Sequence, residues 1–507
     1  MRQKYSLFIY LLVLAALLLI IRHAATLRRN SYVQIPESSI VLDERTWVWQ
    51  GLSIRQSGIP AGWSSIETYQ KGPLGDIEGF TVRVDNVMPR LATYGSYPKP
   101  VSSLKTVDFG RGAFYMSYVQ PLLDNPPLGG LIYSLFIPSK VKSYLEVAPN
   151  DYRNGSLWLA VLTTVLIFVL AWQIFKSWII ALLAAAIYGS APVFLLLSRY
   201  ALLENILAPL ILLVLNLLML AESLRKSHKR LVVFLILISA VMAGSCALVK
   251  ETGWAAVGMG VFLLWFWKFS YKQIITFAGV AFLVGILYFV WGMYLAPKLF
   301  PQILLYHSTY RPFIGSLNFI TSIWKINILN FPLDGWWLGG FLSLLLLPHD
   351  RKYVVIFTGV ITYLVATLFM GSANYPWYFI PLIPFMCLSM ALFFWELAVS
   401  PKLSSILIFF LIFFSSSFYW GFGVFKAALA STHFQQPVAL YRLLLLFFVV
   451  LGLGWKFWPN KMERYKPVWY LFMVGLGWWV LTLNDRSMLF MLSHWGHIPS
   501  LYTPGTF

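Results

Sequence analysis

Stretches of about 20 mostly apolar residues recur along this chain of 507 residues. A helix of that length crosses the roughly 30 Å hydrocarbon core of a bilayer, because each residue adds about 1.5 Å. The chain is therefore constrained to fold as a bundle of membrane-spanning helices. We expect an all-α polytopic membrane protein with about thirteen transmembrane helices, at 5–21, 157–175, 177–197, 201–221, 231–249, 253–268, 273–295, 332–348, 353–371, 376–398, 404–424, 438–456 and 467–483.

The composition agrees with this interpretation. Hydrophobic residues make up 59% of the chain and charged residues 11%, whereas soluble proteins average about 45–50% and about 25%. A soluble globular enzyme is therefore excluded. The net charge of +19 would suggest nucleic acid in a soluble protein, but the basic residues here lie mostly in short loops between apolar runs, so the expected partners are membrane lipids and no nucleic acid.

The distribution of Lys and Arg predicts the orientation. With a cytoplasmic N-terminus, the inside segments hold 16 of the 38 basic residues, the short outside loops and tail hold 8, and the first loop holds 14. Short loops decide orientation, so this bias favours an inside N-terminus and an outside C-terminus. The first apolar run also fits a signal peptide, but the basic residues after it and a poor cleavage site favour a retained anchor.

One long polar segment, at 22–156, interrupts the apolar pattern. It contains 11 of the 19 acidic residues and is punctuated by Gly and Pro, which predicts an extracytoplasmic loop with short helices and no large sheet. The first transmembrane helix at 1–21 precedes it, and a bundle of about twelve helices at 157–507 follows. A second outer loop is expected at 296–331.

Outside the first loop, three acids lie at outer ends of predicted spans: Glu204, Glu251 and Asp334. A charge at bilayer depth costs roughly 2.5–3.5 kcal/mol on insertion scales, so it usually faces a cavity or a partner. No carboxylate lies convincingly at mid-span. This argues against an ion-coupled transporter, whose coupling sites lie near the midplane.

Separate hairpins deliver polar and aromatic groups to the same outer face, as an active site at the lipid–water boundary requires. A donor sugar on a membrane-embedded polyprenyl phosphate and an acceptor hydroxyl would suit such a site. The candidate catalytic residues are Asp43 and Glu44. The candidate substrate-binding residues are Asp124, Asn125, Arg199, Glu204, Asn205, Lys250, Glu251, His307, Arg311, Tyr375, Trp377 and Tyr378.

The chemistry assigns a role to several of these groups. Negative charge grows on the departing phosphate, and cations stabilise it best, which makes Lys250, Arg199 and Arg311 candidates. The attacking hydroxyl needs a base, for which we choose Asp43, with Glu44 to orient Asp43 or the acceptor. A single in-line attack implies inversion at the anomeric carbon. The aromatic side chains at 375–378 could stack on the sugar or line a lipid groove.

Each residue group also has a purely structural interpretation. The acidic pair could be solvated surface, the Pro-Pro stretch after Asn125 a turn before a helix, and the charges near Arg199 and Lys250 ion pairs at span ends. The aromatic residues at 375–378 could form an interfacial belt. No spacing suggests zinc; no cofactor is firmly implied, although carboxylates could hold Mg²⁺ or Mn²⁺. The joint placement on one face favours the functional interpretation.

Four motifs in this order resemble the GT-C glycosyltransferases, which include protein O-mannosyltransferases and the lipid A aminoarabinose transferase. They are the Asp43-Glu44 pair after the first span, DNPPLG at 124–129, SRYALLEN at 198–205 and KETG at 250–253. The resemblance covers mainly residues 1–260. Two positions depart from the family pattern: Asn125 stands where relatives often have His or Lys, and Glu204 where Asp is common.

The resemblance implies a GT-C fold, a polyprenyl-phosphate-linked sugar donor, a catalytic Asp in the first acidic pair and a site facing the periplasm or lumen. The acceptor would be a protein, lipid or glycan hydroxyl. We expect an inverting glycosyltransferase in a bacterial plasma membrane. Two alternatives stay open: a multi-pass sugar or lipid transporter, which predicts polar groups along a through-membrane path, and a non-catalytic envelope assembly protein with the same fold.

Overall fold

A computed structural model describes residues 2–30, 39–64, 105–108, 113–119, 121–139, 141, 147, 149–310, 327–328, 331–332, 334–369, 376–422 and 435–495. Its elements are α1 (Arg2–Asn30), α2 (Ser39–Ser57), β1 (Gly62–Ser64), β2 (Lys105–Asp108), β3 (Ala113–Val119), α4 (Leu128–Ser134), α5 (Pro149–Phe175), α6 (Trp178–Ser190), α7 (Pro192–Leu197), α8 (Leu203–Leu224), α9 (Lys229–Val249), η4 (Glu251–Gly253), α10 (Trp254–Phe266), α11 (Tyr271–Gly285), α12 (Leu287–Leu295), α13 (Leu299–Tyr310), β4 (Asn327–Ile328), β5 (Phe331–Pro332), α15 (Gly335–Leu345), η5 (Arg351–Tyr353), α16 (Val354–Phe369), η6 (Pro376–Leu382), α17 (Ile383–Val399), α18 (Leu403–Ile408), η7 (Phe409–Phe414), α19 (Ser415–Gly421), α21 (Gln435–Phe457), α22 (Pro459–Arg464) and α23 (Lys466–Trp495).

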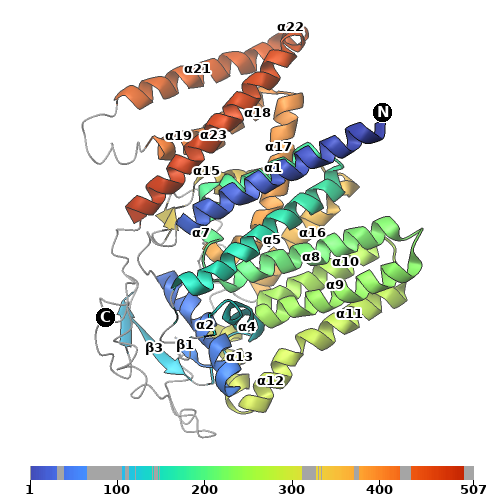
Figure 1. Cartoon of the computed structure of the whole chain (residues 1–507), viewed down its shortest axis with the longest axis vertical. Coiled ribbons are helices and arrows are strands. Elements are labelled where there is room, and N and C mark those ends of the chain that lie inside the picture. The colour runs from blue at the N-terminus through green and yellow to red at the C-terminus, as the bar shows by residue number, and fades with distance from the viewer. Residues whose placement is uncertain are drawn as a thin grey trace.

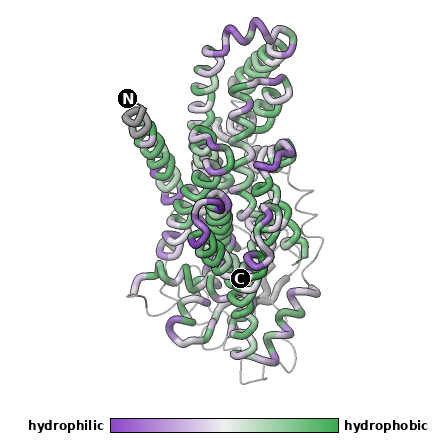
Figure 2. The backbone as a smooth tube through the Cα atoms, turned by 90° about the vertical axis from the view of Figure 1, so that its right-hand side faces the viewer, coloured by the Kyte–Doolittle hydropathy of each residue, from purple (hydrophilic) through white to green (hydrophobic). Residues whose placement is uncertain are grey.

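The predicted helical membrane fold is confirmed. Among the described residues, ten helical segments are long and apolar enough to cross a bilayer, and three shorter apolar helices accompany them, at Trp178–Ser190, Glu251–Phe266 and Gly335–Leu345. Each of them lies within, or overlaps, one of the thirteen stretches expected from hydropathy, but the three shorter helices fall below the length of a span, so the number of thirteen transmembrane helices stays a prediction. Figure 2 shows hydrophobic residues along the long helices and hydrophilic residues at the turn that contains α22.

The first helix is longer than its apolar run suggested. Hydropathy predicted an end at residue 21, but α1 continues to Asn30. The extra turns pack on the bundle, because Ala24 and Arg28 are almost completely buried. Near the same end, Nε2 of His23 lies 3.0 Å from a carboxylate oxygen of Asp485 on α23, so the first and last described helices are in contact.

The described part of the first polar loop forms a small cap at one end of the bundle. It contains α2, α4 and a three-stranded antiparallel sheet in the order β1-β3-β2. Gly62 pairs with Val119, and Lys105 pairs with Met116. In Figure 1 these elements lie together at the lower left, where α5 begins. The expected short helices are thus joined by a sheet too small to form a domain core.

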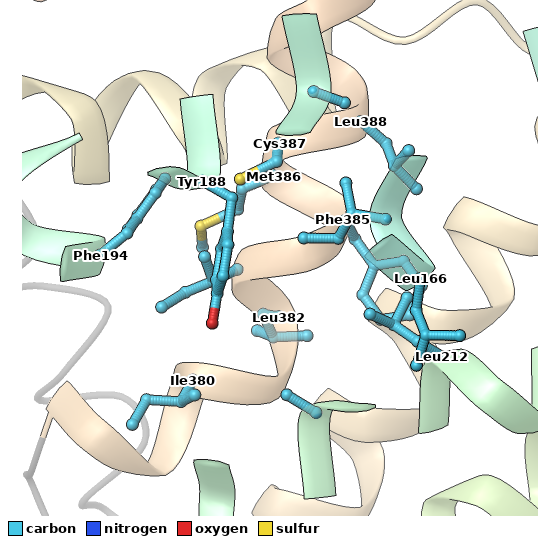
Figure 3. Close-up of a cluster of buried hydrophobic side chains, with 14 of the residues drawn as sticks. Leu166, Tyr188, Phe194, Leu212, Ile380, Leu382, Phe385, Met386, Cys387 and Leu388 are labelled. Carbon is cyan, nitrogen blue, oxygen red and sulfur yellow. The ribbon is translucent and has the colours of Figure 1, made fainter. Parts of the chain in front are cut away.

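The transmembrane helices pack in a continuous array. The helix α8 packs against α5 and α9, and α9 packs against α11, as the parallel ribbons in Figure 1 show. In the centre, α17 packs against α6 and α5. Figure 3 shows this core, where Phe385, Met386 and Cys387 of α17 point among Tyr188, Phe194 and leucines from α5 and α8. Alanines on α6 allow the close approach, as small residues do in membrane bundles.

The two helices of the cap touch backbone to backbone. A Cβ at Gly51 of α2 would lie 1.9 Å from the carbonyl oxygen of Gly130 of α4. Even the smallest side chain at either position must therefore push the helices apart. This contact fixes how closely α2, which carries the acidic pair, approaches the segment before α4.

We predict that Gly51→Ala lowers stability by about 1–3 kcal/mol, the usual cost of inserting a methyl group into a filled contact. Unfolding in mixed detergent micelles measures the change. Gly279→Ala in α11 is the matched control, because nothing lies within 4 Å of a Cβ at that helical glycine, so helix propensity should leave stability unchanged or slightly higher. Equal effects of the two substitutions would contradict the close contact.

Candidate functional site

Glu44 joins three segments that are far apart in the sequence. Its carboxylate is fully buried and accepts two hydrogen bonds from Arg153 of α5, at 2.7 Å from Nη2 and 3.1 Å from Nε. It also accepts a hydrogen bond from the backbone N–H of Ala201, at 2.7 Å. A bidentate Arg–carboxylate pair fixes direction as well as distance. The cap helix α2, the start of α5 and the 198–205 hairpin are therefore held in one arrangement.

Asp43 precedes Glu44 in α2 and is only partly buried. Adjacent residues lie about 100° apart around a helix axis, so the side chains of Asp43 and Glu44 leave α2 on different faces. The two acids thus differ in environment: Glu44 is fully buried and paired with Arg153, whereas Asp43 is only partly buried.

Two buried cations, Arg199 of the 198–205 hairpin and Arg153 of α5, lie beside Tyr200. Arg199 is fully buried, its Nη2 donates to the Tyr200 hydroxyl, and its guanidinium carbon lies 4.5 Å from the centre of the Tyr200 ring. The Arg153 guanidinium lies 5.4 Å from the same ring. Burial lowers the pKa of Arg199, but a guanidinium keeps its charge in proteins. The hairpin therefore concentrates positive charge next to α2.

The side-chain amide of Asn205 braces this hairpin from within, and its predicted role in substrate binding stays a prediction. Its Nδ2 donates to the carbonyl oxygens of Leu197, at 2.9 Å, and Tyr200, at 2.8 Å. These carbonyls belong to the end of α7 and the turn before α8, which have no helical partners of their own. The Asn205 amide thus supports the loop that presents Arg199 and Glu204.

Lys250 and Glu204 form a buried ion pair between the two hairpins. Their side chains are 7% and 2% exposed. The Lys250 ammonium also lies 3.8 Å from the centre of the Tyr378 ring, a cation–π contact. Tyr378 is held in turn by the Tyr363 hydroxyl, which donates to its carbonyl oxygen at 2.8 Å. Three of the sequence-predicted residues therefore meet in one cluster.

The DNPPLG segment is fixed from three directions. The Ser64 hydroxyl of β1 donates to Oδ2 of Asp124 at 2.6 Å, and Nε2 of Gln50 donates to the carbonyl oxygen of Asn125 at 2.9 Å. The Tyr288 hydroxyl of α12 donates to the carbonyl oxygen of Leu123 at 2.8 Å. Asp124 and Asn125 are both buried. The segment and the residue before it thus tie β1 and α2 of the cap to α12.

The α4 helix brings this segment to both hairpins. A Cβ at Gly129 would lie 2.3 Å from Cδ2 of Leu203 and 3.4 Å from Cγ1 of Val249, which directly precedes Lys250. The Tyr133 hydroxyl donates to the carbonyl oxygen of Leu202 at 2.8 Å. The predicted convergence of the hairpin tips is therefore seen in these contacts.

The remaining predicted site residues are more peripheral or lie outside the described residues. Glu251 is partly buried in η4, and Trp377 is buried in η6 next to the Tyr378 ring. His307 is partly buried in α13, with its ring beside that of Tyr306. Arg311 and Tyr375 lie outside the described residues.

Sequence reasoning missed two buried arginines. In the sequence, Arg153 is one of the 14 basic residues of the first polar loop, and the structure shows that it is the partner of Glu44. Arg28 follows the first apolar run, yet it is 1% exposed, and its Nε donates to the Ser198 hydroxyl at 2.8 Å. Its guanidinium lies 5.0 Å from the centre of the Tyr188 ring. The signal in the sequence was the position of both arginines next to apolar runs, where a charge usually has a polar partner.

Asp334, the third acid noted at an outer span end, acts as a helix cap. Its Oδ1 accepts hydrogen bonds from the backbone N–H groups of Trp336, at 3.0 Å, and Trp337, at 3.2 Å. This is the usual role of Asp at the N-terminus of a helix.

Within the described residues, no group of three or more His, Cys, Asp or Glu side chains is arranged to hold a metal ion. The expectation that Mg²⁺ or Mn²⁺ is compatible with the site stays a prediction.

Comparisons with known proteins bear on the fold. The family model of the dolichyl-phosphate-mannose-protein mannosyltransferases matches residues 115–301, which is less than half of the chain. A comparison with curated proteins finds no match. ArnT from Cupriavidus metallidurans, in a structure bound to undecaprenyl phosphate, superposes with a TM-score of 0.53 at 14% identity, over 95% of this chain and 76% of that one. Its apo structure gives a TM-score of 0.51 at 13% identity with the same coverage.

These matches confirm the resemblance to the GT-C class of membrane glycosyltransferases, and the chain has the fold of that class. The family match begins in β3 and runs through DNPPLG, SRYALLEN and KETG to α13, so it contains three of the four motifs. The likeness to ArnT extends over nearly the whole chain, including the later helices, for which the sequence offered only number and hydropathy. The protein is thus a multi-pass membrane protein.

We predict that Arg153→Met lowers stability by about 3–5 kcal/mol, because it leaves the Glu44 charge buried without its cation. Unfolding in mixed detergent micelles measures the loss. The double variant Glu44→Gln/Arg153→Met should recover part of it, since no lone charge remains. Glu463→Gln, which removes an exposed pair with Lys466, should stay within about 1 kcal/mol. A loss in the double variant equal to the sum of the losses in Arg153→Met and in Glu44→Gln alone would contradict a coupled buried pair.

Proposed function

We propose that the protein transfers a sugar from a polyprenyl-phosphate carrier to an acceptor hydroxyl, with inversion at the anomeric carbon. The observation that carries the proposal is the meeting of buried cations with a partly exposed carboxylate where four chain segments converge. A sugar phosphate donor needs cations, and an attacking hydroxyl needs a base. The likeness to ArnT, whose structure contains undecaprenyl phosphate, supports the choice of donor.

The donor phosphate is assigned to the cations of the two hairpins. In the displacement, the bond between the anomeric carbon and the phosphate oxygen breaks, and both electrons leave with the phosphate. Lys250 and Arg199 are already desolvated, so their attraction to the growing charge is stronger than it would be in water. Glu204 and Tyr378 hold the Lys250 ammonium in the absence of a donor. Arg311 is kept as a third candidate.

The acceptor is assigned to Asp43. The acceptor oxygen attacks the anomeric carbon from the face opposite the phosphate, and its proton passes to the Asp43 carboxylate. One displacement of this kind inverts the configuration. The carboxylate of Glu44 is occupied by Arg153 and Ala201, so we assign Glu44 as a positioning residue that sets the direction of Asp43.

Other predicted residues fit around this core. The side chain of Asp124, held by Ser64, and the Asn125 segment would border the acceptor side, with Glu251 at the hairpin tip. Trp377, Tyr375 and His307 would line the approach of the sugar or the lipid. The distribution of basic loop residues supports a site on the extracytoplasmic side with the N-terminus in the cytoplasm, and we propose a bacterial plasma membrane.

We predict that Asp43→Asn abolishes transfer while the protein folds normally. Loss of the base should lower turnover by about 10²–10⁴-fold. The assay is mass spectrometry of cell-envelope glycans and lipid-linked sugars in a deletion strain that carries each variant: the wild type should restore the missing glycan, and the variant should leave the donor unused. Asp485→Asn, which alters the contact with His23, is the control. Activity of Asp43→Asn within a few-fold of wild type would refute the assignment. That result is the one expected if the protein is a transporter or an assembly protein.

We predict that Lys250→Ala weakens use of the donor more than use of the acceptor, because the ammonium contacts the phosphate. The readout is the KM for each substrate in detergent-solubilised enzyme. Lys250→Ala also leaves Glu204 buried without a partner, so the double variant Lys250→Ala/Glu204→Gln separates folding from binding: it should regain stability but keep the raised donor KM. Equal changes in the two KM values would contradict contact with the phosphate.

A further inference from the structure

An apolar groove lies at the far end of the bundle from the candidate site. It is formed between α10 and α16, which pack side by side. The helix α10 starts at the KETG hairpin of the site and ends at Phe266, and α16 starts after η5 and runs back toward η6, which carries Tyr378. The residues at 262–266 and 349–354 are therefore at the opposite membrane face (Figure 1).

The groove has about the size of a segment of an acyl chain. Its volume is about 370 Å³, and its apolar wall is formed by Phe262, Phe266, Val354, Phe357 and Ile361. Phe262 and Ile361 are 40% and 57% exposed on the surface of the bundle. A transmembrane bundle presents such positions to lipid tails, so an occupant enters from the bilayer.

The polar end of the groove carries an excess of cations. The Arg351 guanidinium lies 5.1 Å from the centre of the Phe266 ring, and the imidazole ring of His349 stacks on Phe357 with centroids 5.8 Å apart. Lys352 adjoins the groove without lining it: its ammonium lies 3.4 Å from a carboxylate oxygen of Asp350 and 4.7 Å from the centre of the Tyr353 ring. This end of the groove and its margin thus hold two permanent cations against one acid.

One wall residue offers a buried hydroxyl to the groove. Thr358 is 4% exposed, and within the described residues its Oγ1 has no hydrogen-bond partner. Its carbonyl oxygen is occupied by the Thr362 hydroxyl, which donates at 2.6 Å. A buried hydroxyl without a partner is costly. Thr358 lies one helical turn inside the start of α16, about 6 Å along the helix axis, where an acyl ester oxygen would accept a hydrogen bond from its hydroxyl.

We propose that this groove binds a glycerophospholipid with an anionic headgroup from the leaflet opposite the candidate site. The phosphate lies at Arg351 and Lys352, the ester accepts a hydrogen bond from Thr358, and one acyl chain fills the apolar wall. Basic pockets between transmembrane helices bind anionic headgroups in this way. The site is separate from the proposed transferase centre, and its occupant bears a phosphate but donates nothing to the reaction.

The test is native mass spectrometry of the full-length protein in detergent, titrated with phosphatidylglycerol or phosphatidylcholine carrying the same acyl chains. We expect tighter binding of phosphatidylglycerol. Arg351→Ala should weaken it about five-fold, the effect of one cation beside an anionic headgroup. Asp350→Asn, which keeps a helix-capping side chain but removes the competing charge, should strengthen it. Thr362→Phe, which fills the groove without changing charge, should weaken binding of both lipids.

Two controls make the result specific. Lys402→Ala removes an exposed cation from the start of α18, on the same predicted face but outside the groove, and should leave binding unchanged. Soluble glycerol phosphate, which has the anion without acyl chains, should not displace the lipid at equal concentration. Equal affinity for the two lipids, equal effects of Arg351→Ala and Lys402→Ala, or displacement by glycerol phosphate would each overturn the proposal. Because the readout is lipid binding, failure of the proposed transferase function leaves the test unaffected.

Discussion

The ion pair between Glu44 and Arg153 is the contact on which the arrangement of the site depends. Two charges withdrawn from water are favourable only when each finds its partner in good geometry, and here the carboxylate also takes the N–H of Ala201. One side chain therefore orders the cap helix, the start of α5 and the hairpin at once. Any movement of α2 relative to the bundle would break all three bonds, so the position of Asp43 follows from that of its neighbour.

The other polar groups near the candidate site also have local partners. Arg28 bonds to Ser198, Lys250 to Glu204, and Asn205 to the carbonyls of its own hairpin. Each hairpin between apolar helices must satisfy its backbone and its charges locally, because the hydrocarbon offers no hydrogen bonds. A preorganised cluster of cations is the outcome, and such a cluster is what a departing phosphate requires.

The sequence was sufficient for the helices because hydropathy at bilayer length is a local property: each of the thirteen predicted stretches overlaps an apolar helix. It was also sufficient to place Glu204 and Lys250 on one face, although not to show that they pair. It could not reveal that Arg153 is the partner of Glu44, because 109 residues separate them and nothing local marks the match. The end of α1 was missed for a related reason: Arg28 and its neighbours are polar in sequence but become buried through tertiary packing.

The three short apolar helices have a geometric consequence. The helix α6 has 13 residues, so it is about 20 Å long, well short of a hydrocarbon core of roughly 30 Å. Ala191, whose backbone is extended, separates α6 from the six residues of α7, which precede Ser198 and Arg199. The apolar stretch is therefore broken into two helices and reaches less far than one straight helix of the same length would. In the proposed transferase, this break would set the charged hairpin where a lipid-anchored donor and a waterborne acceptor meet, each in its own phase.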